Sequence, residues 1–201
     1  MITIVDYGMG NLRSVQKAFE KIGCQALVSD DPDQVVRADR LVLPGVGAIA
    51  DAISGLESRN LTAPIRAFIA SGRPFLGICL GLQLLFTKSY EDGEHLGLDI
   101  VAGEVVRFPR REGLKVPHMG WNQLQFRTPS PLLAGLDDGC YAYFVHSYYA
   151  VPVDQSVTST ETDYAGPFTS SVWRDNVFAT QFHPEKSQQV GLQLLRNFAA
   201  L

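Results

Sequence analysis

Cysteine is scarce in this chain, and positive charge is not concentrated anywhere along it. Three cysteines among 201 residues, far apart in the sequence, are too few for a disulfide framework or a cysteine-rich zinc site. The 17 lysines and arginines are outnumbered by 21 aspartates and glutamates, and the longest basic run is Arg110-Arg111. The formal net charge of −4 therefore gives no reason to expect nucleic acid or an anionic membrane as a partner. We expect small molecules or proteins instead.

A long apolar segment, a charged leader and a small-residue cleavage site are also missing. The first residues, Met1 to Ile4, enter a strand-like run directly, so neither export nor membrane insertion is indicated. The scarcity of cysteine suits a reducing compartment, and we expect a cytoplasmic protein. Because no repeat, low-complexity tract or long linker interrupts the chain, residues 1–201 are predicted to form a single domain.

The spacing of the apolar residues predicts an α/β fold. In the first half, strand-like runs at 2–5, 26–28, 41–43 and 74–78 alternate with helical patterns, the clearest at 12–22 and 62–71. After Gly103 the pattern changes to short strands with close turns, at 104–108, 121–126, 141–145, 158–161, 170–173 and 177–182. Ser187 is predicted to cap a closing helix. We expect an open, mostly parallel sheet flanked by helices, with a more antiparallel, β-rich second half.

The stretch from Pro74 to Phe86 organises the rest of the chain. An apolar run of strand length passes through Cys79 into an apolar run of helical length, with Gly77 and Gly81 two residues to either side. This is the arrangement of a nucleophile elbow, in which a strained turn lifts the reactive atom above the sheet. The amides and dipole of the following helix would favour a thiolate. The alternative is that Cys79 is a small buried apolar residue, as most free cysteines are.

Two glycine-containing loops follow predicted strands. Residues 6–11 begin a dinucleotide-binding fingerprint, but Arg13 occupies the place of the third glycine, so nucleotide binding is not predicted. In the loop 44–47, the glycines flanking Val46 free the backbone to turn its amides into a cavity beyond the strand's carboxyl end. A plain turn is the alternative for this loop.

A cysteine nucleophile needs a histidine base and a group that orients it, and four histidines are available. His95 lies in an acidic stretch and is expected to be a solvated loop residue. His118 and His146 lie by apparent strand ends and stay possible. His183 is the best candidate, because Glu185 lies two residues on and points the same way in an extended chain. The alternative is a loop in which Glu185 is a capping acid.

Together these residues resemble the class I (triad) glutamine amidotransferases, in which an elbow cysteine and a later His-Pro-Glu form the catalytic triad. The resemblance covers nearly the whole chain and rests on the segments 6–12, 44–48, 77–83, 117–122, 146–148 and 181–187. One departure is small, since Leu82 stands where many relatives carry Met. The resemblance implies a flavodoxin-like architecture in one glutamine amidotransferase domain.

The resemblance also implies a role for each site residue. Cys79 would attack the side-chain amide carbon of glutamine to form a thioester, His183 would shuttle protons, and Glu185 would orient His183. By family position, the backbone N–H groups of Val46 and Leu80 are the oxyanion donors. The residues that help to hold glutamine are, by the same resemblance, Gly47, Gln83, Ser147 and Tyr148. No cofactor and no metal is expected.

The finer motif features resemble the branch of this family that passes ammonia to a separate (βα)8 cyclase subunit in histidine biosynthesis. Free ammonia would escape or be protonated in bulk water, so we expect a heterodimer whose interface covers the active-site mouth. The residues predicted to border that interface are Asn11, His118, Trp121 and Lys186. The alternatives are a glutaminase subunit of another synthase, a cysteine hydrolase acting alone, and a regulatory domain with a relic triad.

Overall fold

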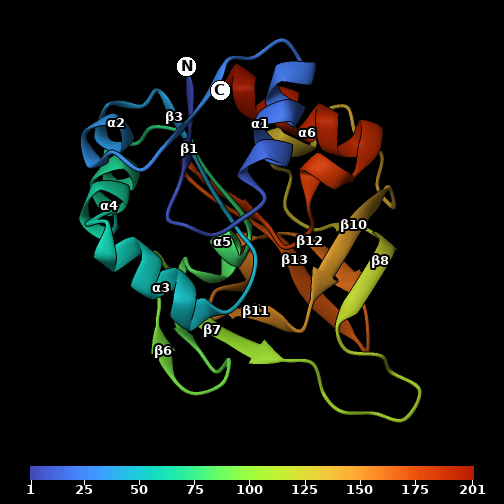
Figure 1. Cartoon of the computed structure of the whole chain (residues 1–201). Helices are drawn as coiled ribbons and strands as arrows, with labels where there is room; N and C mark the ends of the chain where they lie inside the picture. Colours follow the sequence, from blue (N-terminus) through green and yellow to red (C-terminus); the bar gives the residue numbers. More distant parts are fainter.

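The computed structural model describes residues 1–201, in which one large sheet carries helices on both faces (Figure 1). The 14 strands of the chain are β1 (Ile2–Val5), β2 (Ala26–Ser29), β3 (Arg40–Gly45), β4 (Phe75–Cys79), β5 (Phe86–Ser89), β6 (His95–Leu96), β7 (Val101–Arg107), β8 (His118–Gln123), β9 (Gln125–Phe126), β10 (Tyr141–His146), β11 (Tyr148–Pro152), β12 (Thr158–Asp163), β13 (Pro167–Arg174) and β14 (Val177–Thr180). The helices are α1 (Leu12–Lys21), α2 (Pro32–Arg37), α3 (Ile49–Ser58), α4 (Thr62–Ala70), α5 (Leu80–Gln83) and α6 (Gln188–Ala200). Three short 3₁₀ segments are η1 (Pro131–Leu133), η2 (Gln155–Val157) and η3 (Pro184–Lys186).

The large sheet is parallel in one half and mainly antiparallel in the other. Along its main path the strands run in the order β2-β1-β3-β4-β14-β13-β11-β7-β5-β6, and β12 branches from β13 and pairs in turn with β9. The pairs from β2 to β14 are parallel, whereas β14–β13, β13–β11 and β11–β7 are antiparallel and β7–β5 is parallel again. Strands β8 and β10 form a separate antiparallel sheet. Strand β4 therefore lies inside the parallel half, between β3 and β14.

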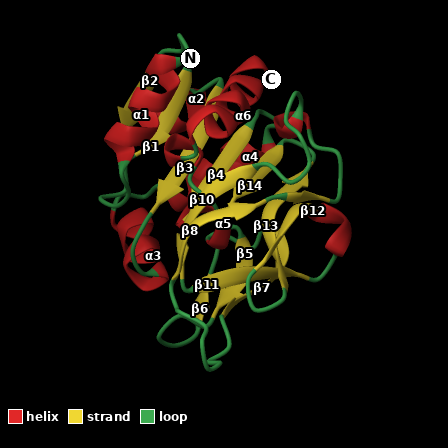
Figure 2. Cartoon of the chain, turned by 90° about the vertical axis from the view of Figure 1, so that its right-hand side faces the viewer, coloured by secondary structure: helices red, strands yellow, loops and turns green.

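Alternating side chains divide the core between the two faces of the sheet. In β3, Leu41 and Leu43 join a cluster with residues of α2, α3 and α4, whereas Val42 joins one with residues of α1 and α6. This period of two is what a strand buried on both faces requires. Helices α1 and α6 lie side by side, and Phe19 and Phe198 meet between them with ring centroids 6.4 Å apart (Figures 1 and 2). None of these helices has the length and apolar character needed to cross a membrane.

The turn between β4 and α5 leaves room only for glycine at its flanks. Cys79 has φ 55° and ψ −105°, a conformation that a residue with a side chain rarely adopts. A Cβ atom at Gly81 would lie 1.8 Å from the Leu43 carbonyl oxygen, and one at Gly77 would lie 2.7 Å from the Gly81 carbonyl oxygen. Because backbone approaches this closely on both sides, the two glycines of the predicted elbow are a steric requirement.

The predicted fold class is confirmed, and so are most elements of the first half. Strands β1 to β4 and helices α1 and α4 lie where the apolar spacing places them, and 32–37 is a helix. In the second half β7, β10, β12, β13 and β14 match predicted strands within a few residues. The segment predicted as one strand at 121–126 is divided, with β8 ending at Gln123 and β9 beginning at Gln125.

Two predictions are wrong in detail, and one α-helix and three strands were not predicted. The elbow helix is only one turn long, Leu80–Gln83, and Phe86 already begins β5. The chain leaves the helix here because the backbone N–H groups of residues 97 and 98 bond to the carbonyls of Thr87 and Leu84, a close approach that Gly97 permits. Ser187 makes no capping bond to α6; its hydroxyl serves the loop before the helix instead. The elements not predicted are α3, β5, β6 and β11.

Replacing Gly81 tests the steric requirement at the elbow. Gly81→Ala should lower the free energy of unfolding by roughly 3 kcal/mol or more, because the new Cβ would overlap the Leu43 carbonyl. Gly72→Ala is the matched control, with φ 78° and nothing within 4 Å of the new Cβ, and should cost about 1 kcal/mol. Urea unfolding of both variants measures the difference; equal losses would contradict the close approach.

Candidate active site

Three neighbouring parallel strands end at the same edge of the sheet and bring the predicted residues together. Strand β3 continues into the loop 44–47, β4 ends at Cys79, and β14 is followed by Gln181 and His183. Gly45 is the register partner of Cys79, so the glycine loop lies directly beside the nucleophile. The carboxyl edge of a parallel sheet is where ligands bind in open α/β folds.

His183 and Glu185 form the buried pair predicted from their spacing. His183 Nδ1 lies 2.8 Å from Glu185 Oε1, and each side chain is 2% exposed. The backbone N–H of His183 donates to the Tyr143 carbonyl at 2.9 Å, and the Ser187 hydroxyl donates to the His183 carbonyl at 2.7 Å. The Ser187 hydroxyl oxygen also accepts from the Tyr143 amide, so β10 and the start of α6 together fix the imidazole. His183 Nε2 has no hydrogen-bond partner within the chain.

Charge at the nucleophile favours a protonated imidazole. Burial opposes charge on His183, but interactions with Cys79 and Glu185 outweigh it and raise the pKa of His183 to about 10. Burial and then the charge of Cys79 also raise the pKa of Tyr7, whose buried hydroxyl has no hydrogen-bond partner. His183 is thus the charged group beside Cys79. The arrangement can therefore supply a nucleophile and a proton donor from one place.

Cys79 lines a cavity of about 290 Å³ that collects the predicted ligand-binding residues. Those residues, all of which line it, are Val46, Gly47, Leu80, Gln83, Ser147 and Tyr148. The Gln83 amide donates one hydrogen bond to the Tyr148 carbonyl at 3.0 Å and one to Gln181 Oε1 at 3.1 Å. With both of its hydrogens bonded, Gln83 has its Oε1 left to accept from a ligand.

Glu91 is a cavity residue that the sequence reasoning missed. It is the one acidic residue lining the cavity, and its Oε2 accepts a hydrogen bond of 2.7 Å from the Ile49 amide. Burial raises the pKa of this carboxyl, although the bond from Ile49 lowers it. Its acidic stretch was interpreted as solvated, but Glu91 is half-buried and His95 lies in β6 with a buried Nε2. The polar sequence gave no signal that the stretch folds back over the site.

His118 and His146 are paired with each other and not with the nucleophile. His118 Nδ1 lies 3.0 Å from His146 Nε2, and His146 Nδ1 lies 2.8 Å from the Tyr148 carbonyl. Burial lowers the pKa of His118 to about 4 and that of His146 to about 3, so both rings are neutral. His118 was predicted at a partner interface. Its side chain is 3% exposed, between the rings of Phe144 and Tyr164, so the surface position is wrong.

The other three predicted interface residues are exposed. Trp121 on β8 contacts Tyr143 on β10, with ring centroids 6.0 Å apart, and Lys186 Nζ lies 5.9 Å from the Tyr143 ring centroid. Asn11 precedes α1 in the loop whose Gly10 approaches the backbone of Gly45. The Trp121 and Lys186 side chains thus share a patch with Tyr143, a residue that the sequence reasoning did not single out.

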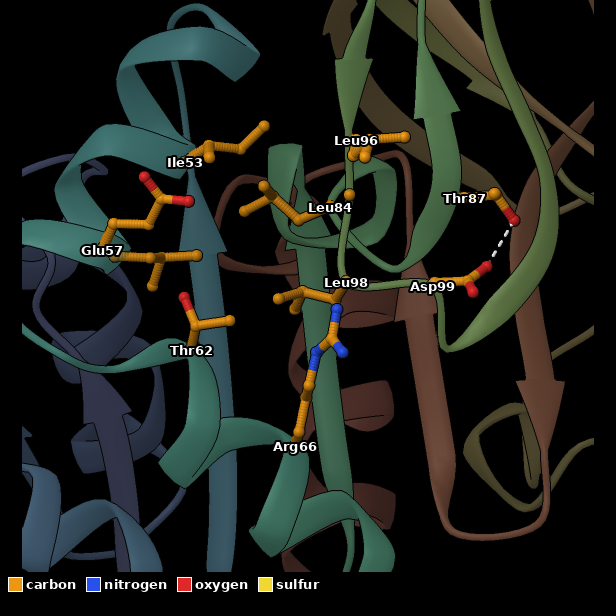
Figure 3. A pocket seen from close by; sticks show the side chains of 11 residues that line it. Ile53, Glu57, Thr62, Arg66, Leu84, Thr87, Leu96, Leu98 and Asp99 are labelled. Carbon is orange, nitrogen blue, oxygen red and sulfur yellow. Dashed lines mark hydrogen bonds between the residues drawn. The ribbon is translucent and has the colours of Figure 1, made fainter.

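A second cavity, of about 370 Å³, contains none of the predicted site residues. It lies between α3, α4 and the β5–β6 hairpin, where Leu84 and Leu98 face Ile53 across it (Figure 3). Arg66 and Glu57 enter from the two helices, and Thr87 donates to Asp99 at the far side. Since no cysteine, histidine or unpaired buried amide reaches it, the catalytic residues must be sought at the smaller cavity.

Comparison with known proteins adds a family match over nearly the whole chain. The family model described as "Glutamine amidotransferase class-I" matches residues 3–200. Imidazole glycerol phosphate synthase subunit HisH of Syntrophotalea carbinolica is 61% identical, over 98% of this chain and 98% of that protein. The subunit of the same name from Aquifex aeolicus is 59% identical, over 97% of this chain and 94% of that protein.

A solved structure supports the fold independently. The structure of PurLQS from Thermotoga maritima matches with a TM-score of 0.76 and 18% identity, covering 99% of this chain and 97% of that chain. At this identity the likeness concerns the fold alone. It agrees with the arrangement of a mostly parallel sheet with helices on both faces and a small antiparallel sheet beside it.

Titration of His183 tests the electrostatics of the site. Because its pKa is raised, the ring should stay charged up to about pH 10 and lose its proton above that. In Cys79→Ala one of the two interactions that raise the pKa is gone, so the pKa should fall. NMR of the ring protons measures both values, and His118 and His146 serve as internal controls that stay neutral above about pH 5. An unchanged His183 titration in Cys79→Ala would contradict an interaction between the sulfur and the ring.

Proposed function

Because this chain belongs to the class I glutamine amidotransferase family and matches HisH subunits at up to 61% identity over nearly its full length, we propose that it hydrolyses glutamine as a subunit of imidazole glycerol phosphate synthase. The observation that carries the proposal is Cys79 at the end of β4 beside a buried His183–Glu185 pair. The ammonia goes to a cyclase subunit that makes imidazole glycerol phosphate and an aminoimidazole carboxamide ribotide in histidine biosynthesis. A cytoplasmic location belongs to the same proposal.

The chemistry follows from the charges in the cavity. The Cys79 sulfur attacks the side-chain amide carbon of glutamine, and the carbonyl oxygen becomes an oxyanion held by the backbone N–H groups of Val46 and Leu80. The His183 imidazolium gives its proton to the amide nitrogen, so that the C–N bond breaks and ammonia leaves. Neutral His183 then takes a proton from water as the water attacks the thioester. Glutamate departs and the sulfur is regenerated.

The cavity fits the two ends of a glutamine molecule. Glu91, its one carboxylate, suits the α-ammonium group, and Gln83 Oε1 is the acceptor left for an N–H of the ligand. Ser147 and Tyr148 line the same wall and would complete the contacts, with Gly47 on the opposite loop. A volume of about 290 Å³ is at the lower end of the range for small-molecule sites, which suits an amino acid.

The partner would dock on the face that carries Trp121. Met119 and Trp121 on β8 are 63% and 46% exposed, and Val46 at the cavity mouth is 38% exposed. Exposed aromatic and methionine side chains are typical of interface cores. We propose that a (βα)8 cyclase subunit covers this face, with Asn11 and Lys186 at its border, so that ammonia passes between the subunits without entering bulk water.

The nucleophile is tested by removing the sulfur. Cys79→Ala should abolish glutamine-dependent synthesis by the complex, while synthesis from added ammonium salts continues, because the cyclase needs only ammonia. Cys140→Ala is the matched control, since that cysteine is free and does not line the cavity, and should stay within about threefold of the unchanged protein. Glutamate formation by Cys79→Ala would refute the assignment.

The partner face is tested by shortening Trp121. Trp121→Ala should weaken association with the cyclase by roughly tenfold or more, as loss of a central aromatic contact does, and should raise the ratio of glutamate formed to imidazole product. Leu96→Ala removes an exposed side chain beside the second cavity and should change neither quantity. Size-exclusion chromatography and a product assay measure both. A full glutaminase rate without any partner would instead favour a hydrolase that acts alone.

A further inference from the structure

Gln181 reaches the nucleophile from a position between the strand β14 and the catalytic histidine. Its side-chain nitrogen lies 3.6 Å from Cys79 Sγ, and the whole residue is buried. The sulfur also faces the Val145 carbonyl at 4.0 Å, which can only accept a hydrogen bond and therefore favours the neutral thiol. Gln181 is thus the one neutral side chain that donates to the sulfur.

The direction of this contact is fixed by a backbone carbonyl. The Tyr148 carbonyl only accepts, so the Gln83 group that faces it must be the NH₂. The second hydrogen of that NH₂ then points to the Gln181 oxygen, and the Gln181 NH₂ must face the sulfur. The orientations of the Gln83 and Gln181 amides therefore both follow from the Tyr148 carbonyl, which cannot donate a hydrogen bond.

The same carbonyl fixes a second chain of bonds that runs to strand β8. His146 Nδ1 must donate to the Tyr148 carbonyl, so its Nε2 accepts from His118 Nδ1. His118 Nε2 is left to accept from Asn122 Nδ2, at 3.2 Å, and Asn122 also donates to the Asp163 carbonyl. Asn122 is the neighbour of Trp121, at the face proposed for the partner. Two chains of hydrogen bonds that meet at the Tyr148 carbonyl therefore join that face to the nucleophile.

We propose that Gln181 is a further catalytic residue, whose amide donates a hydrogen bond that stabilises the thiolate of Cys79. His118 and His146 are positioning residues that hold the Tyr148 carbonyl and so transmit the position of β8 to the sulfur. The proposal rests on the proposed glutaminase function of this site. The amide of Gln181 would add stabilisation that the helix α5 alone provides only weakly, because the dipole of a helix of four residues is small.

Alkylation of Cys79 by iodoacetamide as a function of pH tests the role of Gln181 without any need for glutaminase activity. In Gln181→Met the donor is lost, and the pH midpoint of alkylation should rise by about one unit, a tenfold slower reaction below the midpoint. In Gln181→Glu, which keeps the shape, the midpoint should rise at least as far, because a carboxylate beside a thiolate repels it. These shifts distinguish a charge-stabilising amide from one that only fills the core.

Controls distinguish a failure of the Gln181 proposal from a failure of the proposed glutaminase function. Gln193→Met replaces a half-buried glutamine on α6, whose amide bonds Asn197, and should leave the alkylation profile unchanged. A wild-type profile in both Gln181 variants would overturn the proposal. If the unchanged protein shows no glutaminase activity, alone or with the cyclase, while the alkylation shifts are observed, the proposed function is refuted and the role of Gln181 is not. If Gln181→Met does not fold, Gln181→Glu alone decides.

The role of the histidine pair is tested by two substitutions at His118. The Asn side chain places an N–H where His118 Nδ1 lies, whereas Phe keeps a ring without a donor. His118→Phe should reduce the stimulation of glutaminase by the ligand-bound cyclase at least about threefold, and His118→Asn should restore most of it. If the cyclase stimulates glutaminase equally in His118→Phe and His118→Asn, the His118–His146 pair only fills the core. That result would overturn the positioning role proposed for the two histidines.

Discussion

The conformation of Cys79 is the constraint on which the rest of the site depends. A non-glycine residue at φ 55° is held there only when its surroundings leave no alternative, and the backbones of β3 and β4 do so. Gly81 passes the Leu43 carbonyl so closely that no side chain fits between them. The sulfur therefore has one position, and His183, Gln181 and the cavity are arranged around it.

Two kinds of histidine lie within this small region, and the difference between them is electrostatic. His183 is buried next to a carboxylate and a sulfur, so its charged form is favoured in spite of the loss of water. His118 and His146 are buried among aromatic rings and carbonyl groups, with no anion in contact, so burial keeps them neutral. Burial alone would have lowered all three pKa values. The charge state of each buried imidazole depends on whether an opposite charge lies beside it.

The sequence was informative wherever local geometry carries the chemistry. The glycines around Cys79 and the His-Pro-Glu run predicted the nucleophile turn and a histidine paired with a carboxylate, and the structure places both as expected. The family and the fold class are confirmed as well. The assignment of individual catalytic and binding roles stays a prediction.

The site residues that the sequence analysis missed or misplaced are positioned by contacts between segments that are far apart in the chain. Glu91 lies in a polar stretch that reads as solvated, and only the docking of that stretch on α3 brings it to the cavity. Gln181 could have been found by the same spacing that pointed to Glu185, since residues two apart share a face of an extended chain. His118 was misplaced because a strand end near the site reads as surface, whereas an aromatic cluster covers it.

The contact of Ser187 with His183 has a consequence for how the chain acquires its chemistry. Ser187 joins the loop of the catalytic histidine to β10 and to the start of α6, so the imidazole is held only after the last helix has packed against α1. Synthesis proceeds from the N-terminus, and Cys79 leaves the ribosome long before this helix does. A growing chain thus exposes its thiol without a base beside it. The cysteine and its base come together only when the sheet receives its final strand and the helix that follows.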